Sequence, residues 1–588
     1  MKFRELKKNL KKDFSELKTC KIAILGDSAT QFLNTAIKGY GYNEKINFDI
    51  FEADYDQIER QIYDPESELY EFNPEFIIIF ASSEKLIEKF YSTNSNEKMH
   101  FADNQINKIK ELWERINSKI NCNIINFNYV EINDNIFGNY GNKTKNSFIY
   151  QLRKLNFNLM DIAQQYKNVF ISDVCSLQNV FGRENTFDSK MYASSKMVFS
   201  IDFLPHVAKN IIDIIKASMG KIKKCLIMDL DNTLWGGVIG DDGINNIQIG
   251  ELGAGRAYTE LQMWAKQLKE RGIILAVSSK NTEEIAKEPF IKHPDMVLRL
   301  DDIAVFAANW ETKVDNIKYI QSILNIGFDS MVFIDDNPFE RNMVREMIDG
   351  ITVPELPNDP SEYVSYLRNL NLFETISYSK EDSKRTKQYQ NEAKRVELKK
   401  SFDSVDEYLK SLKMVSEYGS FKDYYIPRIA QLTQRSNQFN MRTVRYTEKD
   451  IERIKNSNDY ITLYFTLEDK FGDNGLISVL ILKKNDDKSL FIDTWIMSCR
   501  VLKRGMEYFV INKLVDLAKE QGYTKIIGEY IPTPKNVLVK DLYKECGFSK
   551  TVLHENDNEK YNKNRNKNDT WVLYVDNYIT KKVYIDNK

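Results

Sequence analysis

The sequence predicts a multidomain protein of the α/β class. Apolar runs of strand length alternate with amphipathic helical patterns along most of the chain, which is typical of parallel sheets covered by helices. At 588 residues the chain is too long for one hydrophobic core. Its hydrophobic content of 42% is sufficient for globular packing. We therefore expect several folded domains in series.

Composition also bounds the function. The 83 basic and 85 acidic residues nearly balance, which argues against general electrostatic binding of nucleic acid. Six cysteines form no CxxC pair, which favours reduced thiols over disulfides or a zinc site. The charged start of the chain lacks an apolar signal core, and the apolar runs are too short to span a membrane. We expect a cytoplasmic protein without nucleic-acid or membrane partners.

The first segment, residues 1–215, predicts a parallel α/β sheet whose first strand ends at Gly26-Asp27-Ser28. Further strands are expected at 76–80, 123–127 and 168–171, and helices at 106–120 and 147–166. The Gly-Asp-Ser turn resembles the nucleophile block of SGNH hydrolases, which implies Ser28 as nucleophile and His206 as its base. However, Asp202 lies four residues before the histidine, where that family has three. Only Asn126 and Asn128 are candidates for an oxyanion hole, so a degenerate hydrolase-like fold is the alternative interpretation.

The second segment, residues 216–373, contains the string around which the chain is organised, Asp229-Leu230-Asp231-Asn232-Thr233-Leu234-Trp235-Gly236-Gly237. It follows a short apolar strand, so Asp229 and Asp231 are expected at the carboxyl end of that strand, where α/β folds bind ligands. Carboxylates crowded at such an edge share a hard cation or perturb one another's pKa. Two further buried strands end in Ser279 and in Asp335-Asp336.

These motifs, with Lys313 between them, resemble the haloacid dehalogenase (HAD) superfamily, and the longer string resembles its FkbH-like branch. The resemblance implies an HAD-like phosphatase or transferase core and Mg²⁺ as cofactor. It implies roles for six residues: Asp229 as nucleophile and metal ligand, Asp231 as general acid/base and metal ligand, Ser279 and Lys313 as phosphate-binding groups, and Asp335 and Asp336 as metal ligands. The intervals between the motifs are too short for a separate cap domain. An uncapped site suits a substrate that is carried on a macromolecule.

Residues 374–412 predict a charged helical connector. Residues 413–588 return to an α/β pattern, with strands expected at 460–465, 475–482 and 490–499. The turn from Arg500 to Met506 before a long helix resembles the cofactor-binding motif of GNAT-type acyltransferases, whose turn amides bind the pyrophosphate of coenzyme A. Lys503 replaces the first glycine of that motif.

The replaced glycine favours one phosphate over a pyrophosphate, so we expect a carrier-linked pantetheine arm at this turn. The expected contacts are Arg500, Arg504, Gly505, Asn536 and Tyr543. A degenerate acyltransferase fold kept for packing is the alternative. Two further strings, residues 431–440 and 471–475, resemble the FkbH-like family.

FkbH-like proteins are associated with polyketide-type pathways. The resemblance implies an enzyme that takes a glyceryl unit from 1,3-bisphosphoglycerate, removes phosphate and loads the acyl group onto an acyl carrier protein; polysaccharide decoration is another pathway in which it could act. Glyceryl-transferring members carry a cysteine at the position of Leu230, so Cys499 is a candidate relay thiol. The alternatives are a stand-alone Mg²⁺-dependent phosphatase on a carrier- or sugar-linked phosphate and a non-catalytic scaffold.

Overall fold

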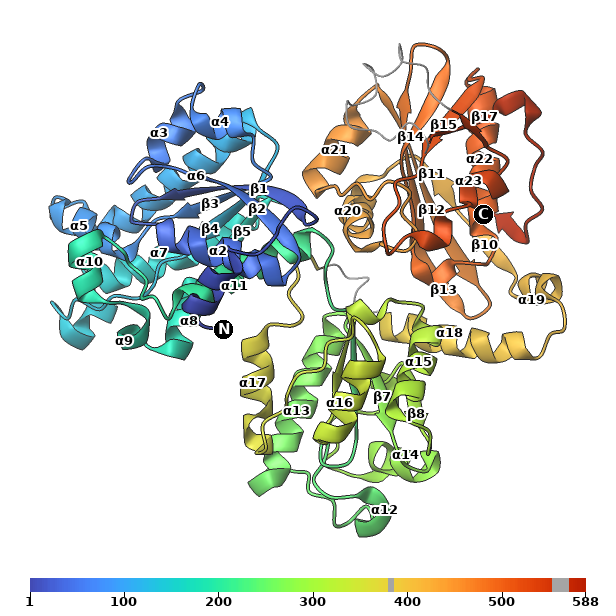
Figure 1. Cartoon of the computed structure of the whole chain (residues 1–588), viewed down its shortest axis with the longest axis horizontal. Helices are drawn as coiled ribbons and strands as arrows, with labels where there is room; N and C mark the ends of the chain where they lie inside the picture. Colours follow the sequence, from blue (N-terminus) through green and yellow to red (C-terminus); the bar gives the residue numbers. More distant parts are fainter. Residues whose placement is uncertain (379–384, 552–569) are drawn as a thin grey trace. The chain divides into compact units, whose positions relative to one another are not determined.

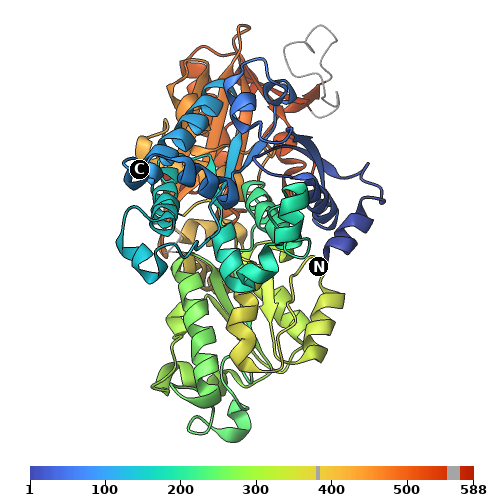
Figure 2. The same ribbon diagram turned by 90° about the vertical axis from the view of Figure 1, so that its left-hand side faces the viewer.

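The computed structural model describes residues 1–378, 385–551 and 570–588 (Figures 1 and 2). These form two compact units, Met1–Lys216 and Ala217–Lys588. Part of the predicted connector, residues 379–384, lies outside the described residues. No helix within the described ranges combines the length and the apolar character needed to cross a membrane.

Unit 1 is a parallel sheet with helices on both faces (Figure 1). Its strand order is β2-β1-β3-β4-β5. The strands are β1 (Lys18–Gly26), β2 (Ile46–Glu52), β3 (Phe76–Phe80), β4 (Asn123–Phe127) and β5 (Val169–Ser172). The main helices are α2 (Gln31–Asn43), α5 (Ser83–Ser92), α6 (Phe101–Lys119), α7 (Phe148–Ala163), α8 (Val174–Phe181) and α11 (Leu204–Ser218). The apolar stripes of α6 and α7 bury one face of the sheet.

Unit 2 begins with a four-stranded parallel sheet in the order β8-β7-β6-β9. Its strands are β6 (Cys225–Met228), β7 (Ile274–Ser279), β8 (Val305–Ala308) and β9 (Met331–Ile334). Its helices are α12 (Ile239–Asp242), α13 (Gly253–Glu270), α14 (Glu283–Lys292), α15 (Lys313–Leu324), α16 (Pro338–Met347) and α17 (Tyr363–Leu370). Alternate residues of β6 face opposite sides, so Leu226 and Met228 pack with α13, whereas Cys225 and Ile227 pack with α15.

Two helices, α18 (Arg385–Lys400) and α19 (Val405–Ser411), lead to a mixed sheet. Its strands are β10 (Met414–Ser416), β11 (Tyr418–Gly419), β12 (Tyr460–Asp469), β13 (Gly472–Lys484), β14 (Ser489–Met497), β15 (Lys525–Glu529), β16 (Ser549–Thr551), β17 (Thr570–Tyr574) and β18 (Ile585–Asn587). Its helices are α20 (Ile426–Arg435), α21 (Glu448–Asn456), α22 (Met506–Glu520) and α23 (Leu542–Glu545). The expected multidomain α/β class is confirmed, with two parallel sheets and one mixed sheet.

Candidate active site

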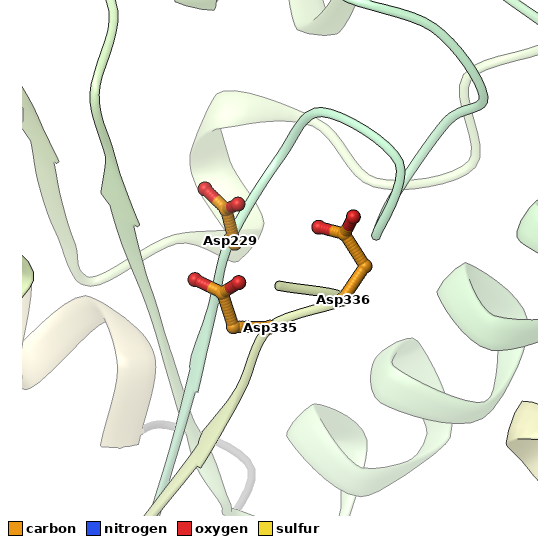
Figure 3. A group of neighbouring side chains, drawn as sticks. All are labelled: Asp229, Asp335 and Asp336. Atoms are coloured by element: carbon orange, nitrogen blue, oxygen red, sulfur yellow. The ribbon is translucent and has the colours of Figure 1, made fainter. Parts of the chain in front are cut away.

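Three carboxylates meet at the carboxyl edge of the β6 sheet. Met228 of β6 pairs with Ile334 of β9, so the next residues of each strand, Asp229 and Asp335, become neighbours. The side-chain oxygens of Asp229, Asp335 and Asp336 lie within 4.8 Å of one another (Figure 3). The structure therefore brings these three predicted acids together, because Asp229 and Asp335 directly follow strand ends and Asp336 is the next residue.

Lys313, the first residue of α15, neutralises part of this charge. It is only 2% exposed, and its ammonium contacts Asp229 Oδ1, donates to the Ser278 carbonyl at 2.7 Å and lies 3.3 Å from Asp335 Oδ2. Burial lowers the pKa of Lys313, but the carboxylates of Asp229 and Asp335 outweigh it, and the net pKa is raised. The lysine is therefore held as a cation against the acids.

The acids still carry more negative charge than Lys313 offsets. Burial raises the pKa of Asp335 to about 7, and the neighbouring Asp229 carboxylate adds to the rise. The pKa of Asp336 is raised by the same two causes. Asp335 Oδ2 is buried and, apart from the Lys313 ammonium 3.3 Å away, has no polar partner among the described residues. An all-oxygen group with such an oxygen fits Mg²⁺, which when bound would act as a Lewis acid toward a phosphate oxygen.

The position of Asp231 differs from the prediction that this residue is a metal ligand. Its carboxylate does not belong to the group formed by the other acids within the described chain. Oδ1 accepts hydrogen bonds from Trp235 Nε1 at 2.9 Å and from the Ile239 amide at 3.0 Å, and Oδ2 accepts from Asn281 Nδ2 at 3.1 Å. The loop that follows β6 therefore turns this carboxylate away from the predicted metal position. Its role as a general acid/base stays a prediction.

The loop after β6 is shaped by local backbone geometry. Asn232 and Gly237 have positive φ values of 53° and 94°, and the Gly237 amide donates to Asn232 Oδ1 at 2.9 Å. The positive φ of Gly237 favours glycine there, because residues with a Cβ rarely adopt it. Thr233 Oγ1 donates to Asp336 Oδ1 at 3.3 Å and accepts from the Asp336 amide at 3.1 Å. These hydrogen bonds hold the loop against Asp336, which follows β9.

Sequence patterns missed several supporting groups. The guanidinium of Arg341 donates to the carbonyls of Asp335 and Asp336 at 2.8 and 2.7 Å. Ser279 ends β7 as predicted and is buried, but it is the preceding Ser278 that accepts from Lys313, and its Oγ has no partner among the described residues. These groups act across the sheet, so only tertiary structure reveals them.

The mouth of this site is open and partly apolar. The only helix described between β6 and α13 is the short α12, so no separate cap domain is present in that interval, as the motif spacing predicts. Trp310 and Phe339, which follow β8 and β9, are 77% and 69% exposed. Large apolar side chains with this exposure at the mouth of a site mark a surface that a partner can cover.

Unit 1 shows no assembled hydrolase triad. Ser28 is 4% exposed, but its Oγ has no hydrogen-bond partner in the described structure. The ring of His206 instead packs against Phe181, with centroids 4.1 Å apart, and burial lowers its pKa. Asp202 is exposed. The degenerate alternative therefore agrees with the geometry.

The two candidates for an oxyanion hole in unit 1, Asn126 and Asn128, already form hydrogen bonds within the protein. Asn126 Oδ1 accepts from Trp113 Nε1 at 3.1 Å, and Asn128 donates to Asp173 at 2.7 Å while it accepts from the Cys175 amide at 3.0 Å. Both amides therefore serve the packing of neighbouring elements.

The arginines predicted to bind a pantetheine arm have internal partners. Arg504 is 3% exposed and lies in a buried ion-pair network, with Nη1 3.2 Å from Asp469 Oδ2 and Nη2 in contact with Glu392. Arg395 shares both acids. Arg500 donates to Ser498 Oγ at 3.2 Å. Arg504 is thus a structural residue, which corrects the prediction for it.

Asn536 and Tyr543 are also internal. Both are 0% exposed. Asn536 Nδ2 donates to the carbonyls of Asn440 and Ile531, each at 2.9 Å, and the Tyr543 hydroxyl is enclosed in the core of the mixed sheet. Gly505 precedes α22 with a φ of 78°, as a turn glycine. Of the predicted contacts, Asn536 and Tyr543 are corrected to packing roles.

A segment of the chain fills the space between β14 and β15. These parallel strands pair only through residues 489–491 and 525–527. Beyond that point residues 439–442, here called the wedge, bond to both sides: the Met441 amide donates to Trp495 at 3.3 Å, and its carbonyl accepts from Ile531 at 2.9 Å. Arg442 joins Asp493 and Glu529, each at 2.7 Å. The end of the first family-like string, residues 439–440, is thus part of the sheet.

Cys499 lies at the opposite edge of the β6 sheet from the acids. Its carbonyl accepts from Asn325 Nδ2 at 2.9 Å, and Asn325 caps the carboxyl end of α15, which begins with Lys313. Twelve helical residues span about 18 Å, so no direct relay joins the thiol to the carboxylates. The structure does not bring this predicted relay residue to the site.

Comparisons with known proteins agree with this site. The family model described as FkbH, N-terminal domain, matches residues 21–216. A crystal structure of the N-terminal part of the protein BF1531 from Bacteroides fragilis, containing a phosphatase domain complexed with Mg, is 54% identical and has a TM-score of 0.62. The match covers 64% of this chain and 100% of that one. No curated protein matches.

Other solved structures match a smaller part of the chain. A GNAT-family acetyltransferase from Staphylococcus aureus Mu50 is 12% identical, with 27% of this chain and 99% of that one covered and a TM-score of 0.22. Spermidine N-acetyltransferase from Vibrio cholerae is 17% identical, with 28% and 97% covered and a TM-score of 0.21. The family assignment depends on the 54% identity to the Bacteroides structure, on the family-model match and on the acids of the β6 sheet. The chain belongs to the FkbH-like family of the HAD superfamily.

Proposed function

We propose that this chain is a Mg²⁺-dependent phosphotransferase that removes phosphate from an activated, phosphorylated three-carbon unit of glyceryl type. The observation that carries the proposal is the group of Asp229, Asp335 and Asp336 with Lys313 bound against it. The Bacteroides relative, whose phosphatase domain is complexed with Mg, supports the metal and the reaction class. In this role Asp229 would hold the metal, while Lys313 stabilises the phosphate charge.

We further propose that the acyl group passes to the phosphopantetheine thiol of an acyl carrier protein. The open mouth beside Trp310 and Phe339 supports a substrate bound to a macromolecule. Because Leu230 cannot form a thioester and Cys499 lies at the far edge, the carrier thiol itself must attack the acyl carbon. This attack forms the C–S bond, breaks the C–O bond to phosphate and releases inorganic phosphate.

A stand-alone phosphatase is the second candidate. It is favoured by the same absence of a thiol at Leu230, since attack of Asp229 on phosphorus needs none. That attack breaks the P–O bond and leaves the three-carbon unit as a free carboxylate. Water then hydrolyses the phosphoaspartate, which places one solvent oxygen in the released phosphate.

Solvent isotope labelling separates the two reactions. The full chain is incubated in ¹⁸O-labelled water with Mg²⁺, 1,3-bisphosphoglycerate and holo-carrier protein. Attack by the carrier thiol predicts unlabelled phosphate and a carrier whose intact mass increases, whereas the phosphatase predicts labelled phosphate and an unchanged carrier.

Asp229→Asn tests the site itself. Because it removes a predicted metal ligand, and in the phosphatase reaction the nucleophile as well, we expect phosphate release to fall by several orders of magnitude. Asp202→Asn, in the exposed turn of unit 1, is the matched control and should release phosphate at the native rate. Metal-independent turnover that survives in Asp229→Asn would contradict the assignment, and a scaffold function would then remain.

A further inference from the structure

A second charged pair stands at the edge of the β6 sheet. Lys280 follows the last residue of β7, and Glu340 lies in the first turn of α16, after β9. Their side chains form an ion pair between Lys280 Nζ and Glu340 Oε1. In the sheet, β6 lies between β7 and β9, so the pair bridges a gap of about two strand spacings, or roughly 10 Å. The bridge therefore spans the end of the strand that carries Asp229.

Glu340 has an unused acceptor. The residue is 7% exposed, and its second oxygen, Oε2, has no hydrogen-bond partner among the described residues. A buried carboxylate oxygen without a donor is costly, so a group that supplies an O–H or N–H there is favourable. The bridge thus offers an acceptor as well as a cation.

Lys280 has unused donors. An ammonium carries three N–H groups, of which the bond to Glu340 uses one. The Lys280 side chain is 38% exposed, so its remaining donors are accessible from solvent. Two other cations near this edge are committed: Lys313 to Asp229 and Asp335, and Arg341 to backbone carbonyls and Glu355. Lys280 is accordingly a cation available to a substrate group outside the metal position.

We propose that Lys280 and Glu340 form a subsite for the part of the substrate that does not carry the transferred phosphate. Lys280 binds a second acidic group, a carboxylate or a phosphate, and Glu340 Oε2 accepts a hydrogen bond from an adjacent hydroxyl. The ligand class is a short phosphorylated hydroxy acid or bisphosphate. This inference rests on the proposed function, because Asp229, Asp335 and Asp336 must receive the other end of the molecule. Without a cap domain, loop residues of this kind must supply the selectivity.

Two substrates of equal length test the subsite. 3-Phosphoglycerate has a carboxylate where glycerol 3-phosphate has a CH₂OH group, so their kcat/KM ratio reports the acidic end alone. We expect the wild-type chain to prefer 3-phosphoglycerate at least tenfold, and Lys280→Met to reduce that preference to about twofold or less. Lys292→Met, an exposed lysine at the far end of α14 with its own ion pair to Glu288, should keep the native ratio. An equal fall in kcat/KM for both substrates in Lys280→Met would overturn the proposal.

A binding measurement tests the subsite independently of catalysis. Calorimetric titration of Asp229→Asn with the same two ligands in Mg²⁺ should give a tighter Kd for 3-phosphoglycerate. Adding Lys280→Met should remove the difference between the two Kd values. Adding Glu340→Gln should reduce that difference, because the Lys280 ammonium loses its charged hydrogen-bond partner. If the wild type turns over neither these two substrates nor 1,3-bisphosphoglycerate while this preference persists, the proposed function fails and the subsite stands. Equal Kd values for the two ligands in Asp229→Asn would overturn the subsite.

Discussion

At the residue scale, the orientation of Asp231 bears on its predicted role as the general acid/base. Its carboxylate accepts three N–H donors, from Trp235, Ile239 and Asn281. A group that exchanges a proton with the leaving oxygen must be held within hydrogen-bond reach of it. The Trp235 and Asn281 side chains are therefore positioning residues for Asp231.

Removing one donor should reduce turnover in a substrate-dependent way. We expect Asn281→Ala to reduce kcat by about ten- to hundredfold, since a hydrogen bond to a charged group is worth roughly 1.5–3 kcal/mol. The loss should be larger for an alkyl phosphate, whose leaving group needs a proton, than for p-nitrophenyl phosphate, whose leaving group does not. Trp235→Phe should show the same pattern while it keeps the ring. Equal losses on both substrates would argue that the side chains serve only folding.

Asp27 gives unit 1 a pH-dependent stability. Burial raises the pKa of Asp27 from 3.8 to about 6, against hydrogen bonds from Ser82 that lower it. Because the folded state holds the proton more tightly than the unfolded chain, the associated stability is present below pH 4 and is lost as the pH rises through 6. The loss amounts to about 3 kcal/mol.

Chemical denaturation of the full chain between pH 4 and pH 7, followed at the transition of unit 1, tests this. Relative to the wild type, Asp27→Asn should gain about 3 kcal/mol of unfolding free energy across that interval, because its side chain stays neutral. Asp202→Asn, on the exposed turn before α11, should run parallel to the wild type. Parallel curves for Asp27→Asn as well would contradict the assignment.

At the element scale, strand ends were predictable and side-chain partners were not. Asp229, Ser279, Asp335 and Asp336 follow directly from apolar runs, so local sequence places them at one edge of the sheet. The sheet in turn brings them together because parallel strands share their carboxyl ends. The open mouth was predictable as well, because the motif spacing leaves no room for a cap.

The C-terminal predictions failed where partners are distant in sequence. Arg504 pairs with Glu392 and Asp469, and the wedge joins strands that come much later in the chain. A turn motif gives no information about either. The resemblance of the Arg500 to Met506 turn therefore located the start of α22 but not the surroundings of its side chains.

We expect the buried ion-pair network around Arg504 to contribute to the stability of this domain. Arg504→Ala should lower the unfolding free energy of unit 2 by about 3 kcal/mol, because Asp469 and Glu392 lose one of two guanidinium partners inside the protein. Lys503→Ala, at the exposed neighbouring position, should change it by less than about 0.5 kcal/mol. Denaturant unfolding of both variants decides between this role and a ligand-binding role, which predicts no loss of stability for Arg504→Ala.

At the scale of the whole molecule, the chain divides near the end of α11. Unit 1 contains a complete sheet with its own buried core, as expected of a domain that folds alone. We therefore expect a fragment of residues 1–218, which ends with α11, to unfold in a single cooperative transition. Circular dichroism during heating is the measurement, and the full chain should show the same transition beside a second one. A fragment without a cooperative transition would show that unit 1 depends on the rest of the chain.

Helix α15 runs from the edge of its sheet that carries the acids to the opposite edge. It starts at Lys313, against the acids, and its cap Asn325 grips the carbonyl of Cys499, on the turn that leads into α22. The helix therefore joins that turn to the lysine over about 18 Å. Any coupling between the positions of the turn and of the lysine would act in both directions. The contact thus gives the mixed-sheet domain a physical connection to the acids of the HAD core.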